Sequence, residues 1–425
     1  MEEKSCCCCH STPKEEAPVS SGCCCDMGAS AIHKLDDKPV PEKFREADSL
    51  LISSGAETFS MPENHRLTKA AEGHWNLFKE IVDTTLASGW NNQTHPWSPA
   101  LQDFWRYPLA FASYGIPSLI MIDPSRYDEA VSYLKKAIVL MKDTPIWDEW
   151  TRLGFGPDPV SRANIMYKGH LNLLYGLYQL VSGSTEFEQS YKELTGFITD
   201  EYEYNVRELG YYGIECEPDQ WFPQCNSMGM MSMRVRDAIY GTDFDEKYAK
   251  PIAKFIYDRV SDPETGLLFA KYHPSHDQAE AYLTGFCNSW SLTMMHIYNP
   301  SLYERAFGIY KKGFVKEIMD GKAAYLKEYS YSEEPSTGVE ESMGVFYAPG
   351  LSKEYGDIDL WEKVNRYFTS IYGIELKDGT VRFTKATPED ETFVSSYLFW
   401  GTVHQGWDKV LNYDWAGLRA RLGKE

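Results

Sequence analysis

Two cysteines, Cys216 and Cys225, lie nine residues apart in a chain that otherwise uses cysteine sparingly. Seven of its ten cysteines fall within the first 25 residues, so three remain in the 400 that follow. Pro218 and Pro223 discourage a continuous helix here, which predicts a constrained loop leading into a helix near Asn226. A thiol has a reference pKa of about 8.5, and its surroundings move it in either direction. One thiol of such a pair can donate a proton while the other, deprotonated, accepts one.

Three other roles fit the same two cysteines: small buried hydrophobic residues, a disulfide, or ligands of a metal ion. We follow the chemical hypothesis because the segment 213–226 also concentrates carboxylates, aromatic residues and prolines. Glu217 and Asp219 are the carboxylates nearest to Cys216 in sequence, and either could tune a thiol or orient a histidine. As single loop carboxylates, both fit a solvated position equally well.

His170 is the next candidate. It lies in a largely apolar stretch, residues 161–182, where an imidazole must find a hydrogen-bond partner or stay neutral. Taken alone, such a histidine is more often a core residue than a catalyst. Gly169 and Gly176 leave room beside it, which favours an inner helix packed against a pocket.

Familiar catalytic motifs are missing from the sequence. It contains no G-x-S-x-G, H-E-x-x-H, Walker A or G-x-G-x-x-G pattern, and therefore gives no support to serine hydrolysis, zincin chemistry or nucleotide cofactors. His273 and His276 have loose spacing, and we interpret them as loop residues.

Composition narrows the class of partner. A formal net charge of -20 removes the attraction to phosphate on which non-specific nucleic-acid binding relies, so nucleic acid and anionic membranes are unlikely partners. Aromatic residues make up 14%, which an aromatic-lined cavity would explain. No apolar run is long enough to span a bilayer, and the N-terminus has no secretory pattern, so we expect a cytoplasmic protein with reduced thiols.

Residues 1–45 differ from the remainder. They mix cysteine clusters with Ser, Pro, Lys and Glu and show no apolar period, which predicts a disordered tail. The clustered thiols could bind soft metal ions, although their spacing does not match a zinc site; otherwise the tail is dispensable or adhesive. We expect one catalytic domain over residues 46–425.

The elements that must position these side chains are helices. Apolar residues recur every three or four positions, as in Ala130, Leu134, Ile138 and Met141. Gly/Met/Leu-rich helices alternate with helices charged on one face, which predicts an all-α (α/α)6 barrel with inner and outer rings. The Asp378-Gly379 pair predicts a β-hairpin over 373–383. The expected helices lie near residues 65–88, 101–121, 127–142, 161–182, 187–203, 225–240, 246–260, 281–298, 301–319, 340–350, 357–373 and 391–412.

These same residues carry a resemblance to the linalool dehydratase-isomerase family. The similar segments are 164–173 (NIMYKGHLNL), 178–181 (YQLV), 216–219 (CEPD) and 224–227 (QCNS), with weaker similarity around them over residues 75–410. The resemblance implies an (α/α)6 barrel, a cyclic homo-oligomer that is a pentamer in the family, and chemistry without cofactor or metal.

The resemblance also implies roles for single residues. It places the catalytic histidine at His170 and the catalytic cysteines at Cys216 and Cys225. Glu217 and Asp83 complete the set of catalytic candidates. The substrate pocket is expected to contain Met166, Tyr107, Phe286, Trp290 and Tyr272.

Three departures separate this chain from the family pattern. An Asp and a Tyr six residues apart reach a neighbouring subunit's site in the family; here Asp83 is the nearest counterpart, and Gly89 stands where the Tyr should be. Phe286 replaces a pocket tyrosine. Asp143 occupies a position of the family's structural disulfide.

Our leading hypothesis is a hydro-lyase or isomerase that acts on a small hydrophobic, terpenoid-type allylic alcohol. Loss of water needs a proton donor, a base and a cavity that tolerates an allylic cation, which thiols, an imidazole and aromatic rings could supply. The alternative is the same scaffold used for cyclisation or a double-bond shift of another hydrophobic substrate. Glycan processing would need two pocket carboxylates, and a lipid- or metal-binding protein would show no turnover.

Overall fold

The computed structural model describes residues 64–90, 104–328, 343–385 and 388–424. The cysteine-rich tail predicted over residues 1–45 lies outside the described residues, as do residues 46–63 of the expected catalytic domain. The predictions for those segments therefore stay predictions.

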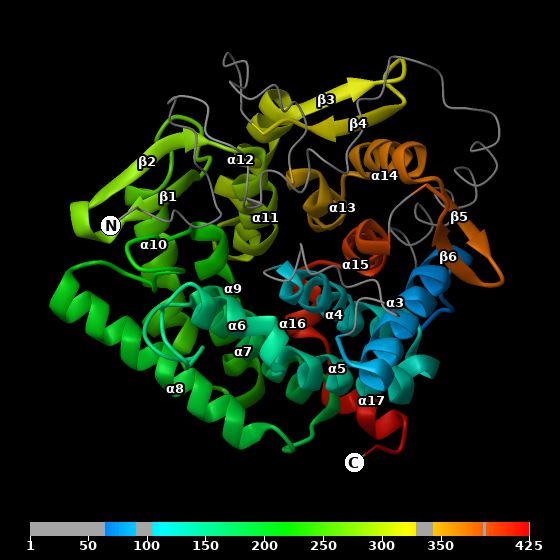
Figure 1. Ribbon diagram of the computed structural model, residues 1–425, viewed down its shortest axis with the longest axis horizontal. Coiled ribbons are helices and arrows are strands. Elements are labelled where there is room, and N and C mark those ends of the chain that lie inside the picture. Colours follow the sequence, from blue (N-terminus) through cyan, green and yellow to red (C-terminus); the bar gives the residue numbers. More distant parts are fainter. Residues whose placement is uncertain (1–63, 91–103, 329–342, 386–387, 425) are drawn as a thin grey trace.

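Six largely buried helices form an inner ring (Figure 1). Each packs against the next in chain order, and the last packs against the first, so the ring is closed. The inner helices are α4 (Arg106–Ile122), α7 (Ile165–Ser182), α9 (Pro223–Tyr240), α11 (Gly285–Met295), α13 (Gly344–Glu354) and α15 (Pro388–Val403).

Six further helices surround this ring, and each rests on at least one inner helix. Two nested rings of six helices confirm the predicted (α/α)6 barrel. The outer helices are α3 (Lys69–Ser88), α5 (Tyr127–Met141), α8 (Glu188–Tyr204), α10 (Lys250–Arg259), α12 (Pro300–Phe314) and α14 (Ile358–Tyr372).

Helix α5 shows why the outer helices form. Ala130, Leu134 and Ile138 are buried along one face, while Asp128 and Lys135 are exposed on the other. Burial of such a stripe, rather than helix propensity alone, stabilises a surface helix. The apolar period in the sequence therefore predicted both the helix and the face that it buries.

Shorter helical segments complete the rings. The π-helical turn η3 (Asn205–Leu209) extends α8, and η4 (Asp245–Ala249) leads into α10. The others are α6 (Thr144–Arg152), α16 (Trp407–Asn412), α17 (Trp415–Arg421) and the 3-10 turns η2 (Pro124–Arg126), η5 (Pro274–His276) and η6 (His296–Tyr298).

Three antiparallel hairpins interrupt the helices: β1 (Phe269–His273) with β2 (Gln278–Leu283), β3 (Val315–Ile318) with β4 (Ala323–Leu326), and β5 (Ile374–Lys377) with β6 (Thr380–Phe383). The third confirms the predicted hairpin, and both of its turn residues, Asp378 and Gly379, have positive φ. The helices predicted over 281–298 and 301–319 were wrong at their edges, because residues 281–283 and 315–318 are strands.

The inner helices all run in one direction. Gly169 of α7 approaches α9 so closely that a Cβ there would lie 3.0 Å from the Gly229 backbone nitrogen. The outer helix α5 returns the chain, since the hydroxyl of Tyr127 at its start donates to Val181 at the end of α7. The N-termini of the inner helices therefore gather at one end of the barrel, and so do the side chains that they carry there.

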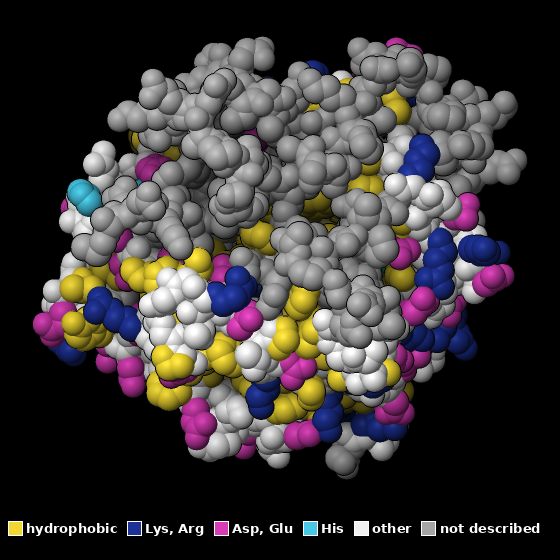
Figure 2. All heavy atoms as spheres, viewed as in Figure 1, with side chains coloured by type: hydrophobic (Ala, Val, Ile, Leu, Met, Phe, Trp, Pro, Cys, Tyr) yellow, Lys and Arg dark blue, Asp and Glu magenta, His cyan; other side chains and the backbone are white. Residues whose placement is uncertain are grey.

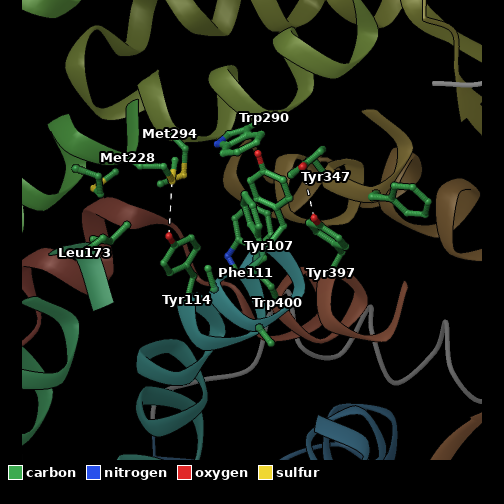
Figure 3. Close-up of a cluster of buried hydrophobic side chains, with 14 of the residues drawn as sticks. Tyr107, Phe111, Tyr114, Leu173, Met228, Trp290, Met294, Tyr347, Tyr397 and Trp400 are labelled. Atoms are coloured by element: carbon green, nitrogen blue, oxygen red, sulfur yellow. Dashed lines mark hydrogen bonds between the residues drawn. The ribbon is translucent and has the colours of Figure 1, made fainter. Parts of the chain in front are cut away.

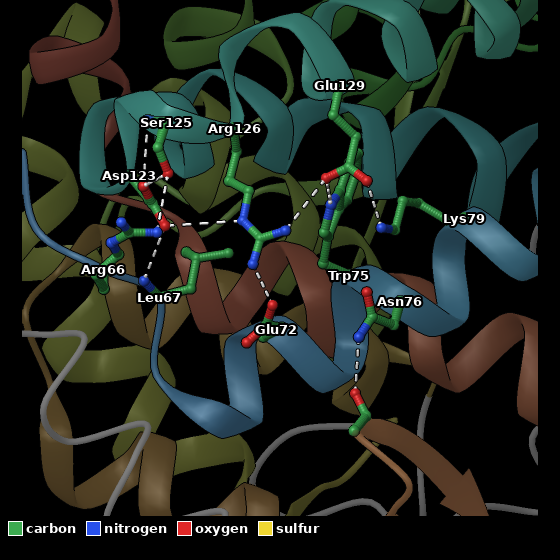
Figure 4. A network of polar contacts seen from close by, with 11 residues as sticks. Arg66, Leu67, Glu72, Trp75, Asn76, Lys79, Asp123, Ser125, Arg126 and Glu129 are labelled. Atoms are coloured by element: carbon green, nitrogen blue, oxygen red, sulfur yellow. Dashed lines mark hydrogen bonds and ion pairs between the residues drawn. The ribbon is translucent and has the colours of Figure 1, made fainter.

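Polar contacts fix the first outer helix to its neighbour (Figure 4). The Glu129 carboxylate of α5 accepts from Trp75 Nε1 at 2.9 Å and from Lys79 Nζ at 2.5 Å, both on α3. The Arg126 guanidinium pairs with Glu72 near the start of α3. Figure 2, viewed from the same side as Figure 1, shows acidic and basic side chains interspersed along the lower and right-hand rim of the molecule.

Candidate functional site

A loop held by backbone and side-chain hydrogen bonds positions the first cysteine. The Asn226 side chain accepts from Ile214 N–H and donates to its carbonyl, both at 2.9 Å. Cys216 N–H donates to Gln220 at 2.7 Å, and its carbonyl accepts from Asn164 N–H at 3.0 Å, next to the start of α7. The predicted constrained loop is therefore present, and it is tied to two inner helices.

The two thiols meet in the interior. The Sγ atoms of Cys216 and Cys225 are 3.4 Å apart, both side chains are buried, and neither forms a disulfide. Cys225 lies in the first turn of α9, which begins at Pro223, where proline suits a helix start. The pair can share a proton at this distance.

His170 projects from α7 among aromatic rings. Its Nδ1 lies 2.5 Å from the Tyr114 hydroxyl, and its Nε2 has no hydrogen-bond partner among the described residues. The rings of Tyr107, Phe111 and Trp290 surround it, with centroids 5.6–5.7 Å away. Burial, assisted by the positive charge of Arg106, lowers the pKa of His170 to about 3. The imidazole is therefore neutral near pH 7.

Arg106, the first residue of α4, brings a charge into this apolar region. Its guanidinium pairs with Glu149 at 2.7 Å and lies 3.3 Å from the Met166 sulfur. The Tyr107 hydroxyl contacts the same sulfur. Burial opposes the charge, but Glu149, Tyr107 and Cys216 favour it, so the pKa of Arg106 is raised well above its ordinary value.

An aromatic cluster fills the barrel beside His170 (Figure 3). Phe111 lies at its centre, with ring centroids of its neighbours 5.0–5.2 Å away. Phe286, at the start of α11, extends the cluster through Trp290 at 5.9 Å and Tyr347 at 5.7 Å. The cluster comprises Tyr107, Phe111, Phe286, Trp290, Tyr347, Tyr397 and Trp400.

Comparison with known families agrees with this geometry. The model of the linalool dehydratase/isomerase family matches residues 106–388, well over half of the chain. The chain belongs to this family. The matched range contains His170, both site cysteines and five of the seven members of the aromatic cluster; Tyr397 and Trp400 lie beyond it.

Solved structures with similar folds are enzymes of other families. A GH76 α-mannanase of Bacteroides thetaiotaomicron is 11% identical, covers 80% of this chain and 97% of its own, and has a TM-score of 0.51. A glycoside hydrolase from family 105 of C. acetobutylicum (12% identity, 77% and 98% covered, TM-score 0.47) and a D-mannose isomerase (13%, 79% and 97%, 0.45) are also similar. At such identities the likeness to the mannanase shows the fold alone.

Within this linalool dehydratase/isomerase fold, four predicted pocket residues lie together. Tyr107, Met166, Phe286 and Trp290 all belong to the aromatic cluster or contact it. Tyr272 is placed elsewhere: its ring packs on Phe255, and its backbone pairs with the cysteine loop at position 221. The structure thus gives Tyr272 a place in supporting the loop.

The loop carboxylates differ in their surroundings. Glu217 follows Cys216 directly in the loop and is buried. Asp219 turns outward, has φ of 62°, and accepts from Ser275 N–H at 2.8 Å. Its carboxylate also lies 3.5 Å from His273 Nδ1, so His273 anchors the segment. The prediction of a loop position for His273 was wrong, because it is the last residue of β1.

Asp83 lies far out on α3. Its side chain is half exposed, contacts the Tyr133 hydroxyl, and pairs with Lys136 at 2.6 Å on α5. These contacts lower the pKa of Asp83 although burial opposes them. Within one chain the structure therefore does not bring Asp83 to the thiols.

Sequence reasoning missed three polar side chains at the site. Tyr114 contacts His170, Arg106 contacts the pocket candidates Met166 and Tyr107, and Glu149 neutralises Arg106. An arginine directly before the apolar run of α4 was a usable signal, since such a charge at the start of a buried helix needs a partner. The third buried thiol, Cys287, lies 3.2 Å from Gln224 Oε1, next to Cys225 in sequence.

Two kinds of feature are absent from the described residues, a cluster of metal-binding side chains and a membrane-spanning helix. The described ranges contain no group of three or more His, Cys, Asp or Glu side chains arranged to hold a metal ion. Among the helices that the structure describes, none has the length and apolar character needed to cross a membrane.

Proposed function

We propose that this member of the linalool dehydratase/isomerase family removes water from, or isomerises, a terpenoid-type allylic alcohol by acid-base chemistry of its cysteines and histidine. The observation that carries the proposal is the buried thiol pair, 3.4 Å between sulfurs, within the segment matched to the family. Membership supports a lyase or isomerase, and a pair of thiols supplies groups that can donate or accept a proton.

In this proposal Cys216 is the base. The Arg106 charge acts on Cys216, and a nearby guanidinium favours a thiolate over a thiol. The Cys225 sulfur lies 3.4 Å from the Cys216 sulfur, close enough for the two groups to exchange a proton. The thiolate is then poised to remove a proton from the carbon next to the developing cation.

His170 holds the alcohol. The Tyr114 phenol, which burial keeps protonated by raising its pKa, donates to Nδ1, so the ring proton lies on Nε2. Nε2 has no partner in the described part of the chain and can donate to the substrate oxygen. The aromatic cluster then faces the cation with its ring π-systems, which attract positive charge.

Phe286 favours a second candidate on the same scaffold. It replaces a hydroxyl-bearing ring with an apolar one inside the aromatic cluster. A site that lacks such a hydroxyl suits a substrate that is apolar at that point, as in cyclisation or a double-bond shift of another hydrophobic molecule.

We also propose that the working form is a cyclic homo-oligomer. Asp83 is half exposed on the outer ring, where a neighbouring copy has access to it. This placement is compatible with a carboxylate that completes the site of another subunit rather than its own.

The direct test is turnover. Purified protein is incubated with linalool, geraniol and other allylic alcohols, with iodoacetamide-treated protein in parallel, and the headspace is analysed for hydrocarbon. Hydrocarbon or isomerised alcohol from the native protein alone supports the proposal. Equal yields from both samples would exclude the thiols, and no conversion of any allylic alcohol would exclude the substrate class.

A further inference from the structure

A buried carboxyl group that the proposed mechanism does not use lies beside the aromatic cluster. Glu328 follows strand β4, and its backbone carbonyl accepts from Gly285 N–H at 2.6 Å. Its side chain, 7% exposed, accepts a hydrogen bond from the backbone N–H of Phe286. Both donors belong to the first turn of α11, so Glu328 lies at the end of the barrel where the inner helices begin.

The same end holds the other site residues. Arg106 begins α4, Met166 lies in the first turn of α7, and Cys225 in the first turn of α9. Phe286, whose N–H binds the Glu328 carboxyl, directs its ring at Trp290 in the aromatic cluster. Glu328 is thus joined to the aromatic cluster through the backbone of Phe286.

The carboxyl group differs from an ordinary helix cap. A capping carboxylate is ionised and gains from the positive end of the helix. Here burial, only partly offset by the Phe286 N–H, raises the pKa of Glu328 to about 8. No salt bridge to it forms within the described ranges. Its titratable neighbour on α12 is Tyr310, whose hydroxyl donates to Gly285 instead.

We propose that Glu328 is a further catalytic residue, the carboxylic acid that protonates the leaving hydroxyl of the substrate. The inference rests on the proposed function, because it assigns the second proton transfer that dehydration requires. A thiol pair with one thiolate supplies the base, and a neutral imidazole supplies orientation. Dehydration also needs a general acid, which is most effective when it is protonated at neutral pH and its pKa lies close to the working pH.

The step balances without a further reactant. The Glu328 proton moves to the hydroxyl oxygen, the C–O bond breaks with both electrons on oxygen, and water leaves. The Cys216 thiolate takes a proton from the adjacent carbon, and that C–H electron pair becomes the new double bond. The proton then returns from the Cys216 thiol to the Glu328 carboxylate through water, which restores both groups.

Glu328→Gln is the test, because glutamine keeps the size and the acceptor for Phe286 N–H but loses the acidic proton. We expect kcat to fall by roughly 10²–10³-fold with little change in KM, and the alkaline limb of the pH profile near 8 to disappear. Glu317→Gln, on the exposed strand β3 of the same hairpin, is the matched control and should retain wild-type turnover.

A second measurement does not depend on turnover. Because the folded-state pKa of Glu328 is raised, the wild-type protein should lose thermal stability relative to Glu328→Gln as pH rises from about 5 to about 8. If the glutamine variant does not fold, Glu328→Asp replaces it as the test. Aspartate keeps the carboxylic acid on a side chain one methylene shorter, so we expect a lower rate with the alkaline limb of the pH profile retained.

The outcomes separate the two proposals. An active wild type with an equally active Glu328→Gln variant and an unchanged pH profile overturns the role of Glu328 alone. A wild type that converts no allylic alcohol overturns the proposed function, and the acid role assigned here falls with it. The pH-dependent stability difference then still decides whether Glu328 is a neutral acid in the folded protein.

Discussion

The rings of Tyr114 and His170 lie nearly parallel, with centroids 5.9 Å apart and the phenol oxygen 2.5 Å from Nδ1. Tyr114 comes from α4 and His170 from α7, so the contact joins two neighbouring inner helices. One hydrogen bond thus fixes both the ring orientation and the tautomer of the histidine.

Removing that bond tests its importance. Tyr114→Phe keeps the stacked ring but leaves Nδ1 without its donor, so we expect turnover to fall roughly tenfold and the free energy of unfolding to fall by about 1 kcal/mol. Steady-state kinetics and urea titration measure the two effects. Turnover equal to wild type would show that the tautomer is set by something other than Tyr114.

Replacing either thiol of the pair should cause a larger loss of rate. Cys216→Ala and Cys225→Ala should each fold but lose roughly two to four orders of magnitude in rate, as for loss of a general acid or base. Cys287→Ala, which removes the other buried thiol of the described residues, serves as the control and should stay close to wild type. Retained activity in either of the first two variants would remove that cysteine from the mechanism.

Substrate choice should respond to position 286. We expect weak activity on linalool itself and a gain with Phe286→Tyr, because the new hydroxyl can bind a substrate alcohol beside Trp290 and Tyr347. Relative kcat/KM values on linalool and on a less polar analogue give the readout. Efficient conversion of linalool by the unchanged protein would contradict this expectation.

Asp83 allows a complementation test of the oligomer. If Asp83 serves a neighbouring subunit, Asp83→Asn and Cys216→Ala should each be inactive alone, and mixed oligomers should regain part of the activity. Light scattering checks that both variants keep the assembly. Full activity of Asp83→Asn would leave this carboxylate only a structural role in its contacts with Lys136 and Tyr133.

The sequence predicted the barrel because its cause is local: apolar spacing and turn residues recur in every helix, as in α5. Individual strands were harder to predict. A strand of four residues such as 315–318 is too short for its apolar period to distinguish it from the last turn of α12. The three residues singled out in the sequence, Cys216, Cys225 and His170, all lie on α7, on α9 or on the loop that is hydrogen-bonded to both helices.

Contacts between distant residues were beyond the sequence. Arg106, whose charge acts on Cys216, lies 110 positions before it in the chain, and the approach of Glu328 to Phe286 depends on where β4 returns the chain. Tyr272 was expected in the pocket, but its strand pairs with the cysteine loop and turns its ring toward Phe255. Such placements follow from packing between elements, which a single sequence does not encode by spacing.

A buried carboxylate at the far end of the barrel gives a prediction about acid stability. Glu354, the last residue of α13, accepts from His404 Nε2 at 2.7 Å and lies 2.9 Å from His296 Nδ1. Burial opposes the charge of Glu354, but the hydrogen bonds from the two histidines outweigh this effect and lower the pKa of Glu354 to about 2.

A carboxyl with a lowered folded-state pKa stabilises above its ordinary value of 4.5 and loses that contribution as pH falls toward 2. Glu354→Gln should therefore reduce the free energy of unfolding by about 3–5 kcal/mol at pH 7. Denaturant titrations from pH 7 to pH 2.5 should show the wild-type advantage shrink with acidity. A constant difference across this range would contradict the assignment.

The packing of α15 against α4, which closes the inner ring, affects how the protein folds during its synthesis. These helices, Arg106–Ile122 and Pro388–Val403, are the first and last of the inner ring and are separated in sequence by the other four inner helices. A ribosome adds about 5–20 residues per second, so α4 waits many seconds for its partner while its apolar surface is exposed. Closure of the barrel is therefore expected only after α15 has been synthesised, and a chain that stops before α15 should yield aggregates instead of a smaller barrel.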